Sequence, residues 1–352
     1  MYRLGEMPLP EVLETPAVLR KTIAANRSLA ELKGLTRTIP RPGILINNLA
    51  MQEARDSSEI ENIITTQDDL YTDAGGERLP GSLAAKEVHR YVSALRIGYD
   101  LIRQQGLLTA NHIITVFQAI TGRDEGFRVQ PGTALVNDAT QAVVYEPPQE
   151  ASEIIRLMGI CEELINNDAS LPVDPLIKMA VIHHLFESIH PFSDGNGRTG
   201  RIINVLYLVV KGYLDIPVLY LSRYIVRTKV QYYHLLQAVR DENRWIDWIL
   251  YMLEGVDQTA QQTIRLVQSI SSAMQDYKQR IRETGIYSQE LLNNLFYHPY
   301  TKIEYVTRSI DVSRQTASKY LDRLVEAELL EKRKIGRHNY YINQALMRIL
   351  GE

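Results

Sequence analysis

The chain has 352 residues, with 39 Lys and Arg against 42 Asp and Glu, and a formal net charge of −3. With 45% apolar and 23% charged residues it has the composition of a soluble globular protein of two or three domains, which excludes a wholly disordered chain. Cys161 is the only cysteine, so no intrachain disulfide can form. The apolar run 205–210 is too short to cross a bilayer, and residues 1–10 contain no secretory signal. We therefore expect a cytoplasmic protein with no membrane contact.

Helical periodicity dominates the chain. Residues 1–42 are expected to form a polar, Pro-punctuated arm with one short helical stretch at 28–33. Beyond this arm, apolar residues recur at helical spacing and predict helices at 47–65, 83–103, 108–120, 152–165, 174–189, 198–212 and 229–253. A polar helix over 254–284 is expected to connect this body to the final segment.

The period changes between residues 127 and 145. Short apolar runs, 134–136 and 142–145, flank the turn-like pair Asn137-Asp138, and Pro147-Pro148 ends the segment. This pattern predicts a β-hairpin, the only clear one in the first two-thirds of the chain. The body is therefore expected to be nearly all α.

The most informative stretch is Phe186 to Arg201, FESIHPFSDGNGRTGR. Pro191 disfavours helical geometry at the residue before it, so we expect the preceding helix to end near His190 and to leave that imidazole at a helix-to-loop junction. Gly195-Asn196-Gly197 then forms a turn with free backbone N–H groups that opens into a helix near Arg198. Such a helix start binds phosphate through its N–H groups and its positive dipole end.

The charged residues of this stretch favour an anionic ligand. Arg198 and Arg201 in the first turn oppose the helix dipole, at about 0.3–1 kcal/mol each, and a bound anion reverses that cost. Their i, i+3 spacing places both guanidinium groups on one side of the helix, where they can hold consecutive phosphates. Asp194 is positioned to hold Mg²⁺, and His190 is interpreted as a general base near its ordinary pKa.

Each of these features has a structural explanation when it is taken alone. A Gly-Asn-Gly turn is usually a connector, a histidine at a helix end is usually a cap, Phe192 is a core anchor, and Thr199 and Gly200 are spacers for close helix packing. Together they are hard to explain as packing. His183 and His184 raise a metal-site alternative, but the carboxylate spacing of a zinc-binding helix is missing.

The run from His190 to Arg201 resembles the signature of Fic-domain proteins, His-x-Phe-x-Asp/Glu-Gly-Asn-Gly-Arg-x-x-Arg, at every fixed position. The resemblance covers roughly residues 79–253 and implies transfer of AMP from ATP to a protein hydroxyl. It implies that His190 is the base and that Asp194 is the Mg²⁺ ligand. The implied ATP-binding residues are Gly195, Asn196, Gly197, Arg198, Thr199, Gly200 and Arg201, with both arginines on the outer phosphates.

Two further elements resemble the family. The hairpin that ends at Val143-Val144-Tyr145 resembles the flap, whose edge pairs with a target peptide by strand addition. Tyr232 and Tyr233 resemble the pair that closes the adenine pocket, although Arg240 stands where some relatives have Asn. Amphipathic core filling is the alternative for both tyrosines.

Residues 57–62, SSEIEN, have two interpretations. Ser58 and Glu61 have the S-x-x-E spacing of a capping box, which would make Glu61 a helix-start device. The run also resembles the family's inhibitory motif, Ser/Thr-x-x-x-Glu-Gly/Asn, matched by Ser57, Glu61 and Asn62, and we favour this reading. Pairing of Glu61 with Arg201 would keep that arginine from the γ-phosphate. Relatives imply a second role, in which the same glutamate orients a water that removes AMP again.

The final segment predicts a winged helix: helices at 302–309 and 314–327, joined by a turn at 311–313, then two strands flanking a basic turn. Residues 300–352 hold ten Lys and Arg against seven Asp and Glu. A DNA contact is one interpretation, and protein contact or dimerisation is the other. The residues that would face DNA are Arg314, Gln315, Thr316, Lys319, Lys332, Arg333, Lys334 and Arg337.

We therefore expect a mainly α protein, with a Fic-type helical bundle, a β-hairpin flap and a C-terminal winged helix-turn-helix domain. The expected divisions are an N-terminal arm with inhibitory helix (1–78), a catalytic domain (79–253), a helical linker (254–290) and the winged helix (291–352). The expected function is a self-inhibited AMP transferase that uses ATP and Mg²⁺ on a target protein or on itself, as a homodimer by resemblance. The alternatives are a DNA-binding regulator that senses nucleotide and a histidine metallohydrolase.

Overall fold

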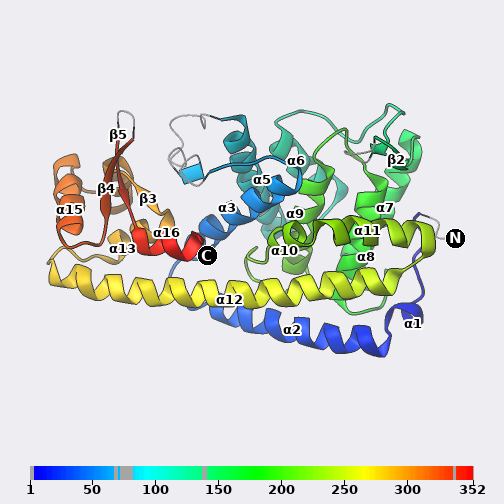
Figure 1. The fold of residues 1–352 in the computed structure, drawn as a ribbon, viewed down its shortest axis with the longest axis horizontal. Coiled ribbons are helices and arrows are strands. Elements are labelled where there is room, and N and C mark those ends of the chain that lie inside the picture. Colours follow the sequence, from blue (N-terminus) through cyan, green and yellow to red (C-terminus); the bar gives the residue numbers. More distant parts are fainter. Residues whose placement is uncertain (1–3, 67–69, 72–81, 137–140, 336–337, 352) are drawn as a thin grey trace.

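The computed structural model describes residues 4–66, 70–71, 82–136, 141–335 and 338–351. The described chain is mainly helical, with one small hairpin and one three-stranded sheet (Figure 1). The mainly α prediction is therefore confirmed. Within the described ranges, no helix combines the length and apolar character that a membrane span requires.

The N-terminal region is more helical than its sequence pattern predicted. After the short helix α1 (Pro10–Leu13), helix α2 (Pro16–Thr36) runs for 21 residues, so the expected arm with helix only at 28–33 is wrong. The Thr15 hydroxyl caps it by accepting a hydrogen bond from the N–H of Val18. Its buried stripe, Val18, Thr22, Ala25, Leu29 and Leu32, lies against helix α12. The intervening charged residues hide this stripe in the sequence.

Helix α3 (Pro42–Ile60) is the element that carries the predicted inhibitory motif. It begins with Pro42 in the first turn, where proline is well tolerated, and it ends at Ile60 rather than at residue 65. Glu61 is its C-cap, and Asn62 adopts a left-handed conformation with φ 62°. Ser58 and Glu61 therefore lie at the C-terminal end of the helix, and the capping-box interpretation is wrong.

The larger part of the molecule is a helical bundle that contains the candidate catalytic residues and is called the catalytic body below. Its central helix is α8 (Pro175–Ile189), whose residues 176–189 are all buried. The other helices of this body are α5 (Leu83–Gln105), α6 (Ala110–Thr121), α7 (Ala151–Asn166), α9 (Asn196–Val210), α10 (Ser222–Arg227) and α11 (Lys229–Glu242), with the 3-10 turn η1 (Asp168–Ser170). Helices α7 and α9 pack directly against α8. Strands β1 (Leu135–Val136) and β2 (Val143–Tyr145) form the predicted antiparallel hairpin. Its turn residues Asn137 and Asp138 lie outside the described residues.

Helix α12 (Trp245–Glu283) has 39 residues and runs along both the helical bundle and the C-terminal domain (Figure 1). The single helix expected over 229–253 is two helices, because Asn243 takes a left-handed conformation that ends α11. Helix α12 then continues without a break through the expected boundary at 253/254. Buried residues from Trp245 to Ile281 hold it against both parts, so residues 254–283 are not a separate linker helix.

The C-terminal domain begins with α13 (Gln289–Tyr297), strand β3 (Tyr300–Thr301), α14 (Ile303–Ile310) and α15 (Arg314–Glu326). Strands β4 (Glu331–Ile335) and β5 (His338–Ile342) follow, and α16 (Gln344–Gly351) ends the chain. The antiparallel sheet has the order β3-β5-β4. The predicted pair of helices and the two strands after it are therefore present, and the Ser313 hydroxyl caps α15 by accepting a hydrogen bond from the N–H of Thr316.

Candidate active site

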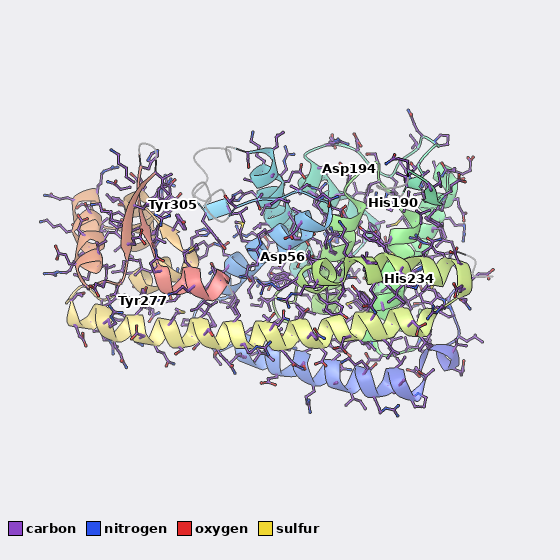
Figure 2. All side chains as sticks on the ribbon, in the orientation of Figure 1. Asp56, His190, Asp194, His234, Tyr277 and Tyr305 are labelled. Atoms are coloured by element: carbon purple, nitrogen blue, oxygen red, sulfur yellow. The ribbon has the colours of Figure 1, made fainter. Side chains whose placement is uncertain are left out.

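His190 lies at the junction between α8 and the loop that follows, as its place before Pro191 predicted. It is the C-cap of α8, with φ 49° and ψ 58° in the left-handed region, and its N–H donates to the carbonyl of Phe186 at 3.0 Å. Its own carbonyl accepts a hydrogen bond from Nε of Arg128 at 2.8 Å. Figure 2 shows His190 and Asp194 in the same part of the catalytic body. The backbone is thus held from both sides of the turn.

The electrostatic environment of His190 differs from our expectation. Burial, together with the nearby cations Arg128 and Arg240, lowers the pKa of its imidazole to about 4, while Glu61 opposes this shift. The expectation of a base near its ordinary pKa is therefore wrong for this arrangement. The imidazole is neutral at pH 7 and can accept a proton, which is the state that a general base requires.

The loop after His190 owes its shape to one amide side chain. The Asn196 side chain accepts a hydrogen bond from the N–H of Phe192 and donates one to the Phe192 carbonyl, both at 2.9 Å. The Phe192 ring is buried and stacks on Phe117 with 3.9 Å between ring centroids. Gly195 has φ 71°, and the Thr199 hydroxyl donates to its carbonyl at 2.9 Å. The side chains of Asn196 and Thr199 therefore stabilise the shape of this loop through hydrogen bonds to its backbone.

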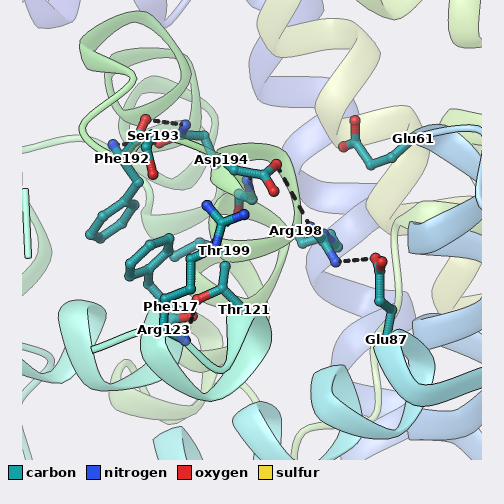
Figure 3. Close-up of polar contacts among 12 residues, drawn as sticks. Glu61, Glu87, Phe117, Thr121, Arg123, Phe192, Ser193, Asp194, Arg198 and Thr199 are labelled. Atoms are coloured by element: carbon teal, nitrogen blue, oxygen red, sulfur yellow. Dashed lines mark hydrogen bonds and ion pairs between the residues drawn. The ribbon is translucent and has the colours of Figure 1, made fainter. Parts of the chain in front are cut away.

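Asp194 and Arg198 lie at the start of α9 (Figure 3). The Asp194 carboxylate accepts a hydrogen bond from the N–H of Gly195 at 2.6 Å, lies 3.9 Å from the Arg198 guanidinium, and is 58% exposed. Arg198 is buried and donates from Nη1 to Glu87 at 2.8 Å. Its Nε is buried without a hydrogen-bond partner among the residues described. The exposed carboxylate can receive a cation, and the buried guanidinium has a donor to spare.

Arg201 is held by the end of α3. Its Nε donates to the Ser57 hydroxyl at 2.8 Å, and its Nη2 donates to the Ser57 carbonyl at 3.0 Å and to Glu61 Oε1 at 2.8 Å. The Arg201 side chain is only 2% exposed. Burial by itself lowers the pKa of Arg201, but Glu61 together with Tyr232 and Tyr91 outweighs it, and the pKa lies above its usual range. The cation is thus fully charged and already paired.

Two small or permissive residues allow this contact. At Gly197, an added Cβ would lie 2.6 Å from Glu61 Oε1 and 2.9 Å from Arg201 Nη1, so a side chain there would collide with the ion pair. Asn62 needs the left-handed conformation that Asn and Gly tolerate, and its side-chain oxygen accepts a hydrogen bond from Lys229 at 3.2 Å. This conformation turns the chain immediately after Glu61.

Three family models match consecutive parts of this chain. The model for the Fic/DOC family N-terminal region matches residues 19–100, and the Fic/DOC family model matches residues 107–208. The C-terminal domain of SoFic-like protein adenylyltransferases matches residues 273–346. The chain belongs to the Fic/DOC family. Its matched N-terminal region contains α3, and the central match contains the whole run from His190 to Arg201.

Individual relatives agree with this assignment. Protein adenylyltransferase fic-1 of Caenorhabditis elegans is 35% identical over 74 residues, which are 21% of this chain and 13% of the relative. Probable protein adenylyltransferase aq_aa38 of Aquifex aeolicus is 26% identical over 184 residues, 51% of this chain and 54% of the relative. The chain thus spans about half the length of the second relative and much less of the first.

Solved structures share the fold. A Fic family protein from Desulfovibrio desulfuricans G20 superposes with a TM-score of 0.62 at 18% identity, covering 97% of this chain and 98% of that one. Fic-1 from C. elegans superposes with a TM-score of 0.55 at 20% identity, covering 71% of this chain and 73% of that one. The match to the D. desulfuricans protein includes the C-terminal domain, so its placement at one end of the chain is part of a known Fic architecture.

The remaining predicted residues of this body lie outside the run from His190 to Arg201 in the sequence. The Tyr232 side chain is buried, and its hydroxyl lies 2.9 Å from Nε2 of His183 inside an aromatic cluster with Trp248 and Tyr251. Tyr233 is about half exposed. Val143 and Val144 are exposed on the hairpin, as an edge that accepts another strand requires.

Several residues of the Fic/DOC site had no role predicted from the sequence. Burial raises the pKa of the Glu187 carboxyl to about 7, and an added Cβ at Gly200 would lie 2.5 Å from its Oε1. Gly200 is therefore a spacer, as expected. Arg240 donates to the Ser188 hydroxyl at 3.0 Å and lies 3.9 Å from the Tyr145 ring centroid, so it joins α11 to β2. No sequence pattern reveals Arg128 or Glu87, because each meets its partner only in the fold.

The histidine metal site is not supported. Nε2 of His183 lies beside the Tyr232 hydroxyl, and its Nδ1 lies 3.1 Å from the side-chain amide nitrogen of Asn204. Nε2 of His184 lies 3.2 Å from the carbonyl of Leu236. Among the residues that the structure describes, no group of three His, Cys, Asp or Glu side chains can hold a metal. A single carboxylate such as that of Asp194 is enough for Mg²⁺, because Mg²⁺ binds through one or two carboxylates together with phosphate and water.

The candidate DNA-contacting residues lie in the C-terminal domain, at the other end of the molecule (Figure 1). Three of them form ion pairs: Arg314 with Glu304 at 2.8 Å, Lys332 with Asp322 at 2.8 Å, and Arg333 with Glu331 at 3.3 Å. Gln315, Lys319 and Lys334 are exposed, and Thr316 is partly exposed. Arg337 lies outside the described residues.

Proposed function

We propose that this Fic/DOC protein transfers AMP from ATP to a Ser, Thr or Tyr hydroxyl of a target protein or of itself, and that Glu61 inhibits the transfer. The observation that carries the proposal is the position of Arg201. A nearly fully buried arginine in the first turns of α9 is paired with Ser57 and Glu61 from α3, in a family whose named relatives are adenylyltransferases.

The chemistry follows from the residues at the start of α9. The attacking hydroxyl oxygen forms a bond to the α-phosphorus of ATP, the bond to the β-phosphate oxygen breaks, and pyrophosphate leaves. His190 receives the hydroxyl proton, which its neutral state permits. The remaining work is positioning and charge neutralisation, as in phosphoryl transfer generally.

The ATP phosphates would lie at the N-terminus of α9. The N–H groups of Asn196 and Gly197 and the helix dipole form the anion site, and Arg198 and Arg201 supply the cations. The N–H of Gly195, also expected at this site, already donates to Asp194. Asp194 would hold Mg²⁺, which neutralises phosphate charge when it is bound. The exposed carboxylate beside Arg198 fits that role.

Competition for Arg201 is the basis of the inhibition. A guanidinium that already donates to Ser57 and Glu61 has fewer donors for a γ-phosphate, and Glu61 also repels phosphate charge. ATP would then bind in an unproductive pose. The same carboxylate, which is about one-third exposed, is also placed to orient a water, and removal of AMP is therefore a second proposed role.

Intact mass spectrometry tests the transfer and the inhibition together. Wild type, Glu61→Gly, His190→Ala and the double variant are incubated with ATP and Mg²⁺. We expect an AMP-sized mass gain on Glu61→Gly, little on wild type, and none on either protein that lacks His190. Equal gains on wild type and Glu61→Gly would rule out inhibition by Glu61. To test removal of AMP, modified Glu61→Gly protein is mixed with unmodified wild type, and loss of the adduct is followed.

Two partner predictions accompany the transferase proposal. The exposed edge at Val143 and Val144 would pair with the target segment, and a homodimer is expected by resemblance alone. The alternative function, a DNA-binding regulator that senses nucleotide, does not need a proton acceptor. Retained ATP binding without any transfer by Glu61→Gly would favour that alternative, and the three ion pairs of the C-terminal domain weigh against it.

A further inference from the structure

Helix α3 contacts two different parts of the protein along its length. Its C-terminal end holds Arg201 through Ser57 and Glu61, as described above. Its N-terminal half lies against α13 and α16 of the C-terminal domain (Figure 1). One helix of 19 residues therefore touches both the candidate active site and the C-terminal domain.

The contact with the C-terminal domain includes hydrogen bonds from three amide side chains. Nδ2 of Asn48 donates to the Phe296 carbonyl at 2.9 Å, and Nδ2 of Asn47 donates to the Tyr297 carbonyl at 3.3 Å. Nε2 of Gln52 donates to the Leu350 carbonyl at 2.7 Å. All three acceptors lie in the last turn of α13 or α16, where helix carbonyls have no partner within their own helix. Helix α3 thus caps both helices.

A buried carboxylate connects the two ends of α3. Glu53 follows Gln52 and lies one turn before Ser57, and it accepts hydrogen bonds from the Tyr91 hydroxyl at 3.0 Å and from the N–H and hydroxyl of Ser222. Since α3 is a continuous helix between Asn48 and Ser57, a shift of one end moves the other. Along the helix, the contacts with the C-terminal domain come first, the contacts of Glu53 with Tyr91 and Ser222 follow, and the contacts with Arg201 come last.

The interface between α3 and the C-terminal domain combines apolar and polar contacts and is not fully filled. Asn48 is buried, but its Oδ1 has no hydrogen-bond partner among the described residues. A cavity of about 620 Å³ lies at the same interface, lined by Arg41 at the start of α3 and by Asn293 and Tyr297 of α13. These polar contacts supplement apolar packing, because Leu45 of α3 and Phe296 of α13 belong to the same buried core.

We propose that the C-terminal domain holds α3 in its inhibitory position, and that Asn48 is a positioning residue for Glu61. This rests on the proposed inhibition by Glu61. Release of Arg201 requires α3 to shift, and the shift breaks the caps on α13 and α16. A binding partner that loosens this interface would then activate the enzyme, although it touches neither ATP nor His190.

The test compares Asn48→Ala with Asn166→Ala in the full-length protein. Asn166 is a matched control, because its amide also joins the backbone of another segment, the Leu108 carbonyl at 2.9 Å, but away from α3. Hydrogen exchange of the α3 amides is measured without ATP. We expect Asn48→Ala to speed exchange at residues 53–61 by about fivefold, the factor that one net hydrogen bond corresponds to, and Asn166→Ala to leave it unchanged. Gln52→Ala, which is partly exposed, should act in the same direction and serves if Asn48→Ala does not fold.

AMP transfer gives the second readout. Asn48→Ala should raise the rate of the wild-type sequence by about fivefold and should add less than about twofold in the Glu61→Gly background, because the contact that it weakens is already gone. If Glu61 leaves Arg201 by rotating its own side chain, transfer and exchange at 53–61 stay at wild-type values and the proposal is wrong. An increase of similar size in the Glu61→Gly background would also overturn it. If Glu61→Gly transfers no AMP at all, the proposed function fails, and hydrogen exchange still decides whether Asn48 positions α3.

Discussion

Two regions of this protein pair cations with carboxylates at the same distance but in different surroundings. Arg201 and Glu61 in the catalytic body, and Arg314 and Glu304 in the C-terminal domain, each have 2.8 Å between nitrogen and oxygen. The Arg201 side chain is 2% exposed, whereas that of Arg314 is 73% exposed. Exposed pairs contribute only about 0–1 kcal/mol, while a buried charge depends on its partner. Distance alone therefore does not tell a strong buried ion pair from a weak surface pair.

The largest expected effect separates the two arginines. In the Glu61→Gly background, Arg201→Ala should lower AMP transfer by about 100-fold or more, because a preorganised cation at the phosphates is lost. Arg314→Ala in the same background should stay within about twofold, since an exposed pair far from α9 supports no step of the reaction. Initial rates with labelled ATP measure both. A similar loss in both variants would show that the C-terminal arginine also serves catalysis.

The next largest effect concerns the pH dependence of AMP transfer, which depends on the pKa of His190 in the buried region. Because burial, Arg128 and Arg240 lower its pKa to about 4, the imidazole stays neutral from pH 8 down to pH 5.5. The kcat/KM of Glu61→Gly, which reports the free enzyme, should vary by less than about twofold over this range. A histidine with an ordinary pKa would lose about tenfold. A midpoint near pH 6.5 would contradict the buried environment.

A smaller effect is expected from Ser57→Ala. The change removes the hydrogen bond from Arg201 Nε to the Ser57 hydroxyl and leaves the contacts with the Ser57 carbonyl and Glu61 in place. We expect a rise in AMP transfer of about fivefold, well below that of Glu61→Gly. Ser58→Ala is the neighbouring control, since the Ser58 side chain is buried without a hydrogen-bond partner among the described residues. Equal rises in both variants would point to general loosening of α3.

The smallest effect concerns the exposed pair. If the C-terminal domain binds DNA, Glu304→Gln frees Arg314 for a phosphate and should tighten binding to a short duplex by about threefold at low salt, with the gain lost as salt rises. Fluorescence anisotropy at two salt concentrations measures this. Absence of binding by either protein at 50 mM salt would end the DNA hypothesis and leave protein contact as the role of this domain.

The sequence predicted the parts of the structure that depend on local pattern. The helix end at His190, the turn at Gly195 and the start of α9 lie where Pro191 and the glycines indicated. The predictions failed where long-range packing decides. Helix α2 is stabilised by its contact with α12, and Glu61 has the spacing of a helix start but lies at a helix end.

The contact partners of the motif residues could not be predicted from the local sequence pattern either. Arg198 meets Glu87 across 111 residues, and Arg128 meets the His190 carbonyl across 62 residues, so neither contact has a signature in the sequence. The lowered pKa of His190 follows from burial and from the nearby cations Arg128 and Arg240. By contrast, the pairing of Glu61 with Arg201 was expected, because both residues lie in motifs and their charges are opposite.

The left-handed backbone of His190 limits how this site can change during evolution. Alanine or a β-branched residue at φ 49° and ψ 58° carries a conformational cost of about 1 kcal/mol or more, whereas Asn and Gly tolerate this region. A lineage that loses the transfer reaction but keeps the fold is therefore expected to replace this histidine by Asn or Gly. For the same reason, His190→Asn is a gentler inactive enzyme than His190→Ala for capturing bound nucleotide.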